Sequence, residues 1–457
     1  MSLPLRKRLP PMLPRAEMQA VEPPRELDGP PGNPLDLLRH RPFLLLWLVQ
    51  TLSQTGQNMV NFSLLILVRG IVERHAIGQL NTAIGLTVLS FTLPAVLFSP
   101  LAGVVADRFN RRTILVLTNA LRGVAVGGLL LIEARWSAYL ALAVLYAITF
   151  VSGAVGQFFG PALASTLPDV APRRQIIQAN ALFNLTFTAS QLVGFAAAGP
   201  LLVKLFGIHT VLSGIIVIFA LCALVSLALP PSCPPARAFP NARRLVAQVL
   251  GEIREGVHFI LASPHLAKAI AYLTIAMATY LMVAVLGPGY VTVVLGLPAE
   301  DIAYLVAPAG IGVVLGTVLV PHVAGRLGSV RTTDCALALG GALLLGLALV
   351  GWSAEGGPNG VGSAETLVAA GLTGLLGIVN GMILAPGQSL LQAGSPEHVR
   401  GRVYATFFTV SNSVAFVPVF FSGALADLFG ISEVLGGIGL LLLVIGCWQL
   451  LAGLRRG

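Results

Sequence analysis

The run from Ile208 to Leu229, IHTVLSGIIVIFALCALVSLAL, determines the class of fold, because it continues without Lys, Arg, Asp or Glu for long enough to cross a bilayer. Runs of this kind recur throughout the chain, which is 56% hydrophobic and only 10% charged. Since about a quarter of a soluble domain is charged, lipid must cover most of this surface. Backbone groups in lipid are satisfied only in helices or closed barrels, and runs this long indicate helices.

The apolar runs fall into two sets of six, separated by a polar gap. We therefore predict an all-α membrane protein with twelve transmembrane helices in two six-helix halves, preceded by a Pro-rich disordered leader at 1–42. The N-terminal half covers 43–229 and the C-terminal half 265–457, and the linker at 230–264 ends in an amphipathic helix. The expected spans are 43–69, 79–105, 113–133, 137–161, 178–203, 208–229, 265–288, 300–324, 333–352, 365–391, 403–427 and 431–452.

The distribution of basic residues predicts the orientation in the membrane. Of the 28 Lys and Arg residues, the odd-numbered loops hold only Arg69, Arg74, Arg135 and Lys204, and Arg122 lies within a span. Cytoplasmic loops carry the excess of basic residues, so both termini and the linker are expected in the cytoplasm, with the chain in the cell (inner) membrane. This bias also accounts for the net charge of +9, and no nucleic-acid partner is expected.

The two halves show a short internal repeat. The fifth span ends with Gly199-Pro200 and then Leu205-Phe206-Gly207, and the eleventh ends with Gly423 and then Leu428-Phe429-Gly430. Secondary transporters are commonly built from repeated halves with a binding site between them at the middle of the membrane.

The loop after the second span, Gly103-Val-Val-Ala-Asp107-Arg108-Phe-Asn-Arg111-Arg112, crowds a glycine, an acid and three arginines into ten residues. A glycine allows two helices to approach closely, and an acid at a helix end can pair with arginines or with the positive end of a neighbouring helix. This cluster could hold one conformation as a latch. The alternative is a basic loop that only sets topology.

This loop resembles the motif G-x-x-x-D-R-x-x-R-R of the major facilitator superfamily. A degenerate copy without the acid follows the eighth span at Ala324–Gly328. The resemblance covers nearly the whole chain and implies a monomeric transporter with spans 1, 4, 7 and 10 around a central cavity. The branch most similar includes the enterobactin exporter and macrolide-efflux-like permeases, on stretches at Phe43–Gly56, Leu167–Asn180 and Gly401–Val403.

Two features bear on proton coupling. Gly194, Gly199 and Pro200 in the fifth span resemble part of the family's antiporter motif. The fourth span lacks the arginine that many proton-coupled drug antiporters carry there, and no Asp or Glu falls at the middle of an expected span. The sequence therefore neither predicts nor excludes a coupling proton as a partner.

A polar stripe runs along the first span. At 100° per residue, its side chains lie within about 60° of one another on one helix face. Polar amides avoid lipid, so they either line a wet cavity or form hydrogen bonds between helices. The stripe consists of Gln50, Gln54, Gln57 and Asn61.

The family plan adds polar residues of other spans to this cavity. Arg122, inside the third span, is a candidate partner of an anionic substrate or of an acid; alternatively, it snorkels to the cytoplasmic face. The remaining candidates are Tyr146 and Gln157 in span 4, Tyr272 and Tyr280 in span 7, and Asn380 and Gln388 in span 10.

We therefore expect a secondary transporter that exports a drug-like or siderophore-like small molecule by alternating access. No cofactor or metal is expected: the chain has no P-loop, and its four cysteines lie far apart. An importer or a lysolipid flippase of the same fold is the alternative. A membrane enzyme would need a convergent acid, base or metal cluster, and a receptor or scaffold would not need the polar stripe.

Overall fold

The computed structural model describes residues 34–132, 135–172, 175–231, 263–355, 363–393 and 397–454, together with 251, 254 and 258. Most of the leader, Arg173, Arg174 and nearly all of the linker and its expected amphipathic helix lie outside these residues. The described part is helical and contains no strand.

The N-terminal part of the chain forms a sequence of helices connected by short turns. After a 3-10 turn, η2 (Pro34–Arg39), these are α1 (Arg41–Arg74), α2 (Leu80–Ala106), α3 (Arg111–Leu129), α4 (Ala138–Val170), α5 (Ile176–Gln191), the π-helix η4 (Leu192–Ala198), α6 (Gly199–Phe206) and α7 (Ile208–Leu227). Elements α5, η4 and α6 follow one another without a break, so they make up one long helical segment.

The C-terminal part repeats this pattern. It consists of α9 (Pro264–Gly289), the π-helix η5 (Tyr290–Val294), the 3-10 turn η6 (Ala299–Ile302), α10 (Ala303–Leu327), α11 (Ser329–Glu355), α12 (Ser363–Ala393), α13 (Glu397–Phe429) and α14 (Ile431–Leu454).

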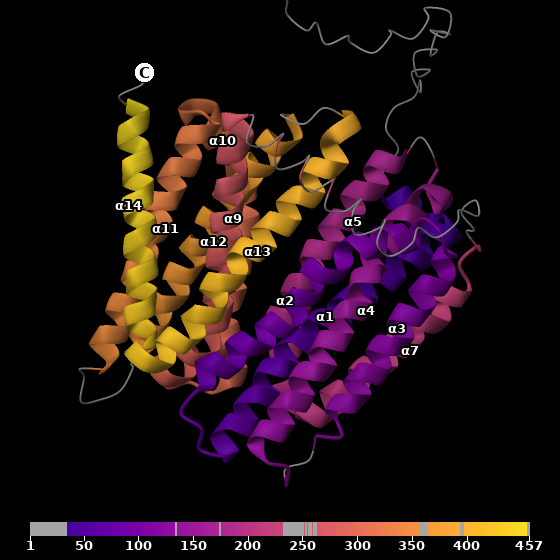
Figure 1. Cartoon of the computed structure of the whole chain (residues 1–457), viewed down its shortest axis with the longest axis horizontal. Coiled ribbons are helices and arrows are strands. Elements are labelled where there is room, and N and C mark those ends of the chain that lie inside the picture. The colour runs from indigo at the N-terminus through magenta and orange to yellow at the C-terminus, as the bar shows by residue number, and fades with distance from the viewer. Residues whose placement is uncertain are drawn as a thin grey trace, which may run out of the picture.

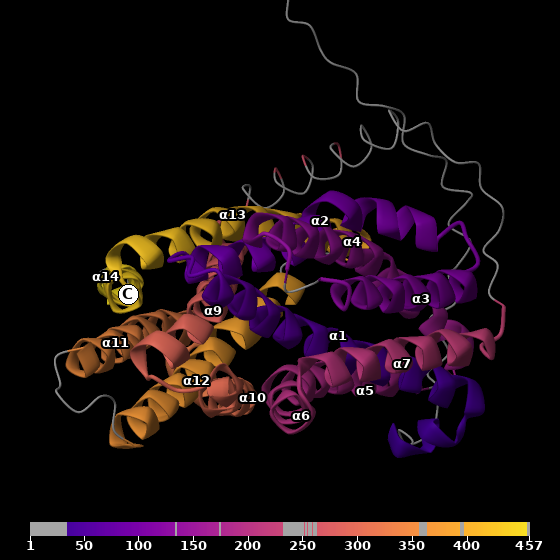
Figure 2. The same ribbon diagram turned by 90° about the horizontal axis from the view of Figure 1, so that it is seen from below.

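The helices gather into two groups that lie side by side. Helices α1 to α7, indigo to magenta in Figure 1, pack mainly on one another, and helices α9 to α14, orange to yellow, do the same. The groups meet where α2 lies along α13 and where η4 lies against α10. Figure 2, seen from below, shows α2 beside α13 on one side of the molecule and α6 beside α10 on the other. We call the two groups the N-terminal and C-terminal halves.

Nine helical segments of the described chain are long and apolar enough to cross a membrane. Helices α1, α3 and α13 are not among them, since α1 carries the amide stripe and α3 carries Arg122, while only the 413–429 part of α13 is apolar. The nine segments are Leu80–Ser99, Ala138–Val170, Gln178–Phe206, Ile208–Leu227, Leu266–Val294, Ala303–Leu327, Ser329–Ser353, Ala364–Gln388 and Ile431–Ala452.

Large apolar side chains project from the outside of both halves. Val124, Leu367, Leu428 and Trp448 are each at least 70% exposed. A soluble monomer exposes such residues only in limited patches, and here they occur on helices throughout the chain. This outer surface suits lipid, while polar side chains such as Asn119 are buried within the bundle.

Candidate functional site

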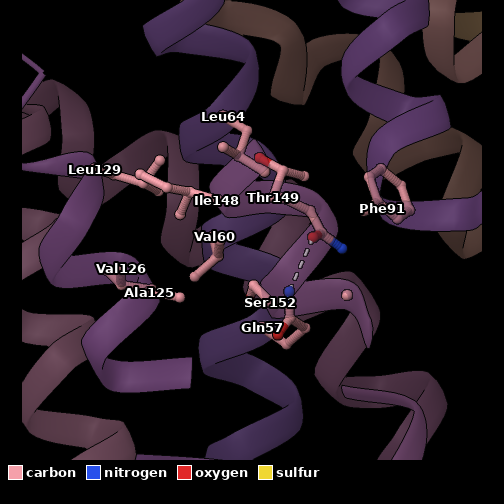
Figure 3. Close-up of a pocket in the computed structure, with 12 residues that line it drawn as sticks. Gln57, Val60, Leu64, Phe91, Ala125, Val126, Leu129, Ile148, Thr149 and Ser152 are labelled. Atoms are coloured by element: carbon pink, nitrogen blue, oxygen red, sulfur yellow. Dashed lines mark hydrogen bonds between the residues drawn. The ribbon is translucent and has the colours of Figure 1, made fainter. Parts of the chain in front are cut away.

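A small pocket lies inside the N-terminal half, among α1, α2, α3 and α4 (Figure 3). The pocket is small, with room for about one water molecule. Apolar side chains form most of the wall, and amide and hydroxyl groups form the rest. The lining residues are Gln57, Val60, Asn61, Leu64, Phe91, Ala125, Val126, Leu129, Ile148, Thr149, Ser152 and Gly153.

The polar stripe of α1 divides between this pocket and the interior of the half. Gln57 and Asn61 line the pocket, and Gln57 Nε2 donates to Asn61 Oδ1 at 3.2 Å. Gln50, one end of the stripe, is buried and donates to the Phe183 carbonyl of α5 at 2.9 Å. Gln54 is partly exposed between them. One part of the stripe therefore lines the pocket, and another part forms a hydrogen bond between helices.

The candidate residues on α4, Tyr146 and Gln157, form hydrogen bonds to α2 and within α4 itself. Tyr146 donates its hydroxyl to the Ala83 carbonyl of α2 at 3.2 Å. Gln157 donates to the carbonyl of Gly153 at 3.3 Å and accepts from Ser99 of α2 at 3.4 Å. Of these residues only Gly153 lines the pocket, so the structure does not bring Tyr146 and Gln157 together with Gln57 there.

Two hydroxyl groups of α4 complete the pocket, and sequence reasoning does not single them out. Thr149 and Ser152 are buried and line it opposite α1. Thr149 follows Tyr146 by three residues and so lies near it on the helix surface. That spacing is the signal that could have identified it, although hydroxyl residues are common in any apolar helix.

In the C-terminal half, Tyr272 of α9 donates its hydroxyl to the carboxylate of Asp334 on α11. Lys268, one turn earlier on α9, places Nζ 3.6 Å from the same carboxylate. Tyr272 and Asp334 are both buried. Sequence reasoning does not single out Asp334, because it falls at the very start of its expected span, while α11 begins several residues earlier.

The remaining candidates of the C-terminal half are not gathered at one place. Asn380 of α12 is partly buried and donates to the Ala276 carbonyl of α9 at 3.4 Å. Tyr280 is 59% exposed, and Gln388 is exposed. Neither lies at the pocket of the N-terminal half.

Arg122 lies in the interior of the N-terminal half. It is 5% exposed, and its guanidinium donates to Ser53 Oγ of α1 at 3.1 Å and to the Gly156 carbonyl of α4 at 3.2 Å. Its side chain is therefore directed into the bundle and does not snorkel along the helix surface.

In the loop between α2 and α3, Arg111 and Arg112 contact residues of the same half, and neither contacts Asp107. Asp107 is exposed, and no hydrogen bond or ion pair joins its carboxylate to another described residue. Arg111 Nη1 donates to Asp169 Oδ2 at 2.7 Å on the last turn of α4, and Arg112 Nη1 donates to the Leu229 carbonyl at 3.4 Å. These contacts lie within one half. A side chain added at Gly103 would meet no described atom within 4 Å, and Arg108 is partly exposed.

The fifth-span glycines allow η4 to pack tightly against α1. A Cβ on Gly194 would lie 2.6 Å from the carbonyl oxygen of Thr55, and one on Gly199 would lie 3.0 Å from the ring of Phe62. Pro200 follows within the same continuous helical segment, to which it supplies no backbone N–H.

One acid joins the two halves at the start of α2. Asp427, near the end of α13, accepts from the backbone N–H groups of Asn81 and Thr82 at 3.0 and 2.8 Å. It also accepts from Asn81 Nδ2 at 2.9 Å and Thr82 Oγ1 at 2.7 Å. A Cβ on Gly423, one turn earlier, would clash with the Asn81 carbonyl, so the glycine permits this close approach. Asp427 therefore acts as an N-terminal cap supplied by the opposite half.

A second polar contact occupies the corresponding place in the other half of the repeat. Lys204 Nζ of α6 lies 2.8 Å from Asp301 Oδ1 of η6. Lys204 precedes Gly207 by three residues, as Asp427 precedes Gly430, and both glycines have positive φ at the start of the next helix. We call these two contacts the clasps.

Residues 46–419 match the family model of the Major Facilitator Superfamily. The chain is 27% identical to the MFS-type transporter YfiS of Bacillus subtilis (strain 168) over 79% of this chain and 82% of the relative. It is 25% identical to the multidrug efflux pump Tap of Mycolicibacterium fortuitum over 82% of this chain and 88% of the relative.

Solved structures show the same fold. The nucleoside transporter NupG superposes with a TM-score of 0.66 at 13% identity, covering 89% of this chain and 98% of NupG. A bacterial homologue of the iron transporter ferroportin, crystallised in an inward-facing state, gives 0.65 at 16% identity, covering 90% and 98%. With the family match over most of its length, this chain belongs to the Major Facilitator Superfamily and is a multi-pass membrane transporter.

Proposed function

We propose that the protein is a secondary active transporter that exports a drug-like or siderophore-like molecule across the cell membrane by alternating access. The proposal includes twelve membrane spans, with α1, α3 and α13 added to the nine apolar segments, and cytoplasmic termini. It also includes a monomeric protein without enzymatic activity. The alternatives are an importer, which would move its substrate in the opposite direction, and a flippase, which would move a lysolipid.

The arrangement of the clasps is the observation that supports alternating access. They join the halves through side chains near the outer ends of α2, α6 and α13, as the positive-inside orientation places them. Hydrogen bonds and an ion pair can open and close as units, and they accompany apolar side chains of both halves that pack in one core. Export is supported by the likeness to the multidrug efflux pump.

Transport assays in inside-out membrane vesicles test the proposal. Vesicles that contain the protein should take up a macrolide or ethidium when their lumen is made acidic, because protons leaving the lumen drive the compound inward, and collapse of the gradient should release it. Vesicles from cells without the protein are the control. Uptake of lysolipid alone would favour the flippase, accumulation only in right-side-out vesicles would favour the importer, and no uptake of any compound in either orientation would contradict transport.

A further inference from the structure

Arg122 is a buried cation with only neutral partners. Its guanidinium contacts the hydroxyl of Ser53, the carbonyl of Gly156 and the faces of Phe159 and Phe219, whose centroids lie 4.9 and 6.0 Å from Cζ. Hydroxyl, carbonyl and ring contacts reduce the cost of burying this charge but do not neutralise it.

No carboxylate of the described chain lies within ion-pair distance of this guanidinium. The described acids of the N-terminal half, Asp36, Glu73, Asp107 and Asp169, occupy the ends of helices or the turns beside them. A buried charge in a membrane helix is costly and indicates a functional partner. No described residue of the N-terminal half supplies such a partner for Arg122.

Arg122 lies one helical turn from the pocket on three helices at once. On α1, its partner Ser53 precedes the pocket residue Gln57 by four residues. On α4, its partner Gly156 follows the pocket residue Ser152 by four residues. On α3, Arg122 itself precedes the pocket residues Ala125 and Val126 by three and four residues. The guanidinium and the pocket of Figure 3 are therefore adjacent layers of the same bundle.

Two buried polar atoms of these layers lack a hydrogen-bond partner. They are Arg122 Nε and Thr149 Oγ1, the latter in the pocket wall. Buried donors and acceptors are almost always paired in native proteins, so these two atoms are available to a polar ligand that enters the pocket. The rest of the wall, which includes Leu64, Phe91 and Ile148, suits an apolar body.

We propose that the pocket and Arg122 form a subsite for the anionic group of an amphipathic substrate, a carboxylate or a phosphate. The anion pairs with Arg122 and the apolar body packs against the pocket wall. The pocket must widen to admit it, as alternating access provides. This inference rests on the proposed transport function for the role of the ligand, but the binding itself can be measured without transport.

Binding of three fluorescent compounds with one shared body tests the subsite. Dansylglycine carries a carboxylate, dansylamide is neutral and dansylcadaverine is cationic. The purified protein in lipid nanodiscs should bind dansylglycine at least tenfold more tightly than the other two. In Arg122→Gln this preference should fall to within about twofold, because the counter-charge is gone. Arg331→Gln, at an exposed arginine of α11, should keep the preference of the wild type. A preference unchanged in Arg122→Gln would overturn the proposal.

A second variant tests the same proposal if Arg122→Gln does not fold. A Cβ on Gly156 would lie 2.9 Å from Arg122 Nη2, so Gly156→Ala should displace the guanidinium while keeping its charge. We expect a loss of anion affinity of several-fold with dansylamide binding unchanged. Equal losses for both compounds, or none, would show that Arg122 has only a structural role.

Two lysolipids distinguish the sources of the anion. Competition by lysophosphatidylglycerol but not by lysophosphatidylcholine would identify a lipid head group, and failure of both to compete would identify a soluble anion. Selective anion binding without uptake of any compound in vesicles would contradict the transport function and leave the subsite standing. Uptake without any preference for anions would support the transport function and contradict the subsite.

Discussion

At the scale of single residues, glycines decide how closely α1 and η4 can pack. Gly194 and Gly214 are matched for a test, because a Cβ on Gly194 would lie within 2.8 Å of both Thr55 and Asn58, and one on Gly214 would meet nothing within 4 Å. Gly194→Ala should lower stability by about 1–3 kcal/mol through overpacking. Thermal unfolding in detergent measures it, with Gly214→Ala as the control. A fall in Tm that is equal for both variants would mean that the contact with α1 is unimportant.

At this scale, some features of the site could be predicted from the sequence and others could not. The stripe of α1 could be predicted, because four amides on one face of an apolar helix are unusual. That Gln57 and Asn61 reach the pocket while Gln50 bonds to Phe183 depends on how α5 sits against α1, which no local pattern encodes. Arg122 stands out as a charge within a span, but its neutral partners come from two other helices.

At the scale of helices, Asp427 of α13 caps the N-terminus of α2 and so joins a helix end of one half to a helix end of the other. The α2 N-terminus carries a partial positive charge, and Asp427 complements it with four hydrogen bonds. The sequence indicates an acid at the outer end of its span. It does not identify the partner, because Asn81 lies 346 residues away.

Removing this acid should open the side of the protein that the positive-inside rule predicts to face outward. Ile302, 3% exposed in a small pocket between the halves, is a suitable reporter. In an otherwise cysteine-free Ile302→Cys protein, Asp427→Ala should raise the labelling rate by a membrane-impermeant maleimide at least several-fold, because a lost charged hydrogen bond costs about 1.5–3 kcal/mol. Asn81→Ala should have a smaller effect, since both backbone N–H groups of the cap remain. Labelling as slow in Asp427→Ala as in the parent would rule out the cap as a latch.

At the scale of the whole molecule, most of the architecture could be predicted, because lipid requires long apolar helices and each run is visible in the sequence. The expected runs overlap the observed helices throughout the described chain, although the π-helices η4 and η5 are not foreseen. A π turn depends on tertiary packing, here of Gly194 and Gly199 against α1.

The orientation of the molecule in the membrane is a prediction at this scale. Alkaline phosphatase, which is active only outside the cytoplasm, should be active when fused after Ala76, in the turn between α1 and α2. Fusion after Gly457 should give an inactive phosphatase and a fluorescent green fluorescent protein, because the positive-inside rule places this terminus in the cytoplasm. The opposite pattern would invert the topology and, with it, the assignment of the clasps to the outer side.

The cap on α2 has a consequence for natural variation. Two of the four groups that Asp427 holds are backbone N–H groups, which every residue except proline supplies. Substitutions other than proline at Asn81 and Thr82 can therefore weaken the cap but cannot abolish it, whereas loss of the carboxylate at position 427 removes it entirely. Among descendants of this chain that keep the same cycle, position 427 should stay acidic, and positions 81 and 82 should drift through most residues but avoid proline.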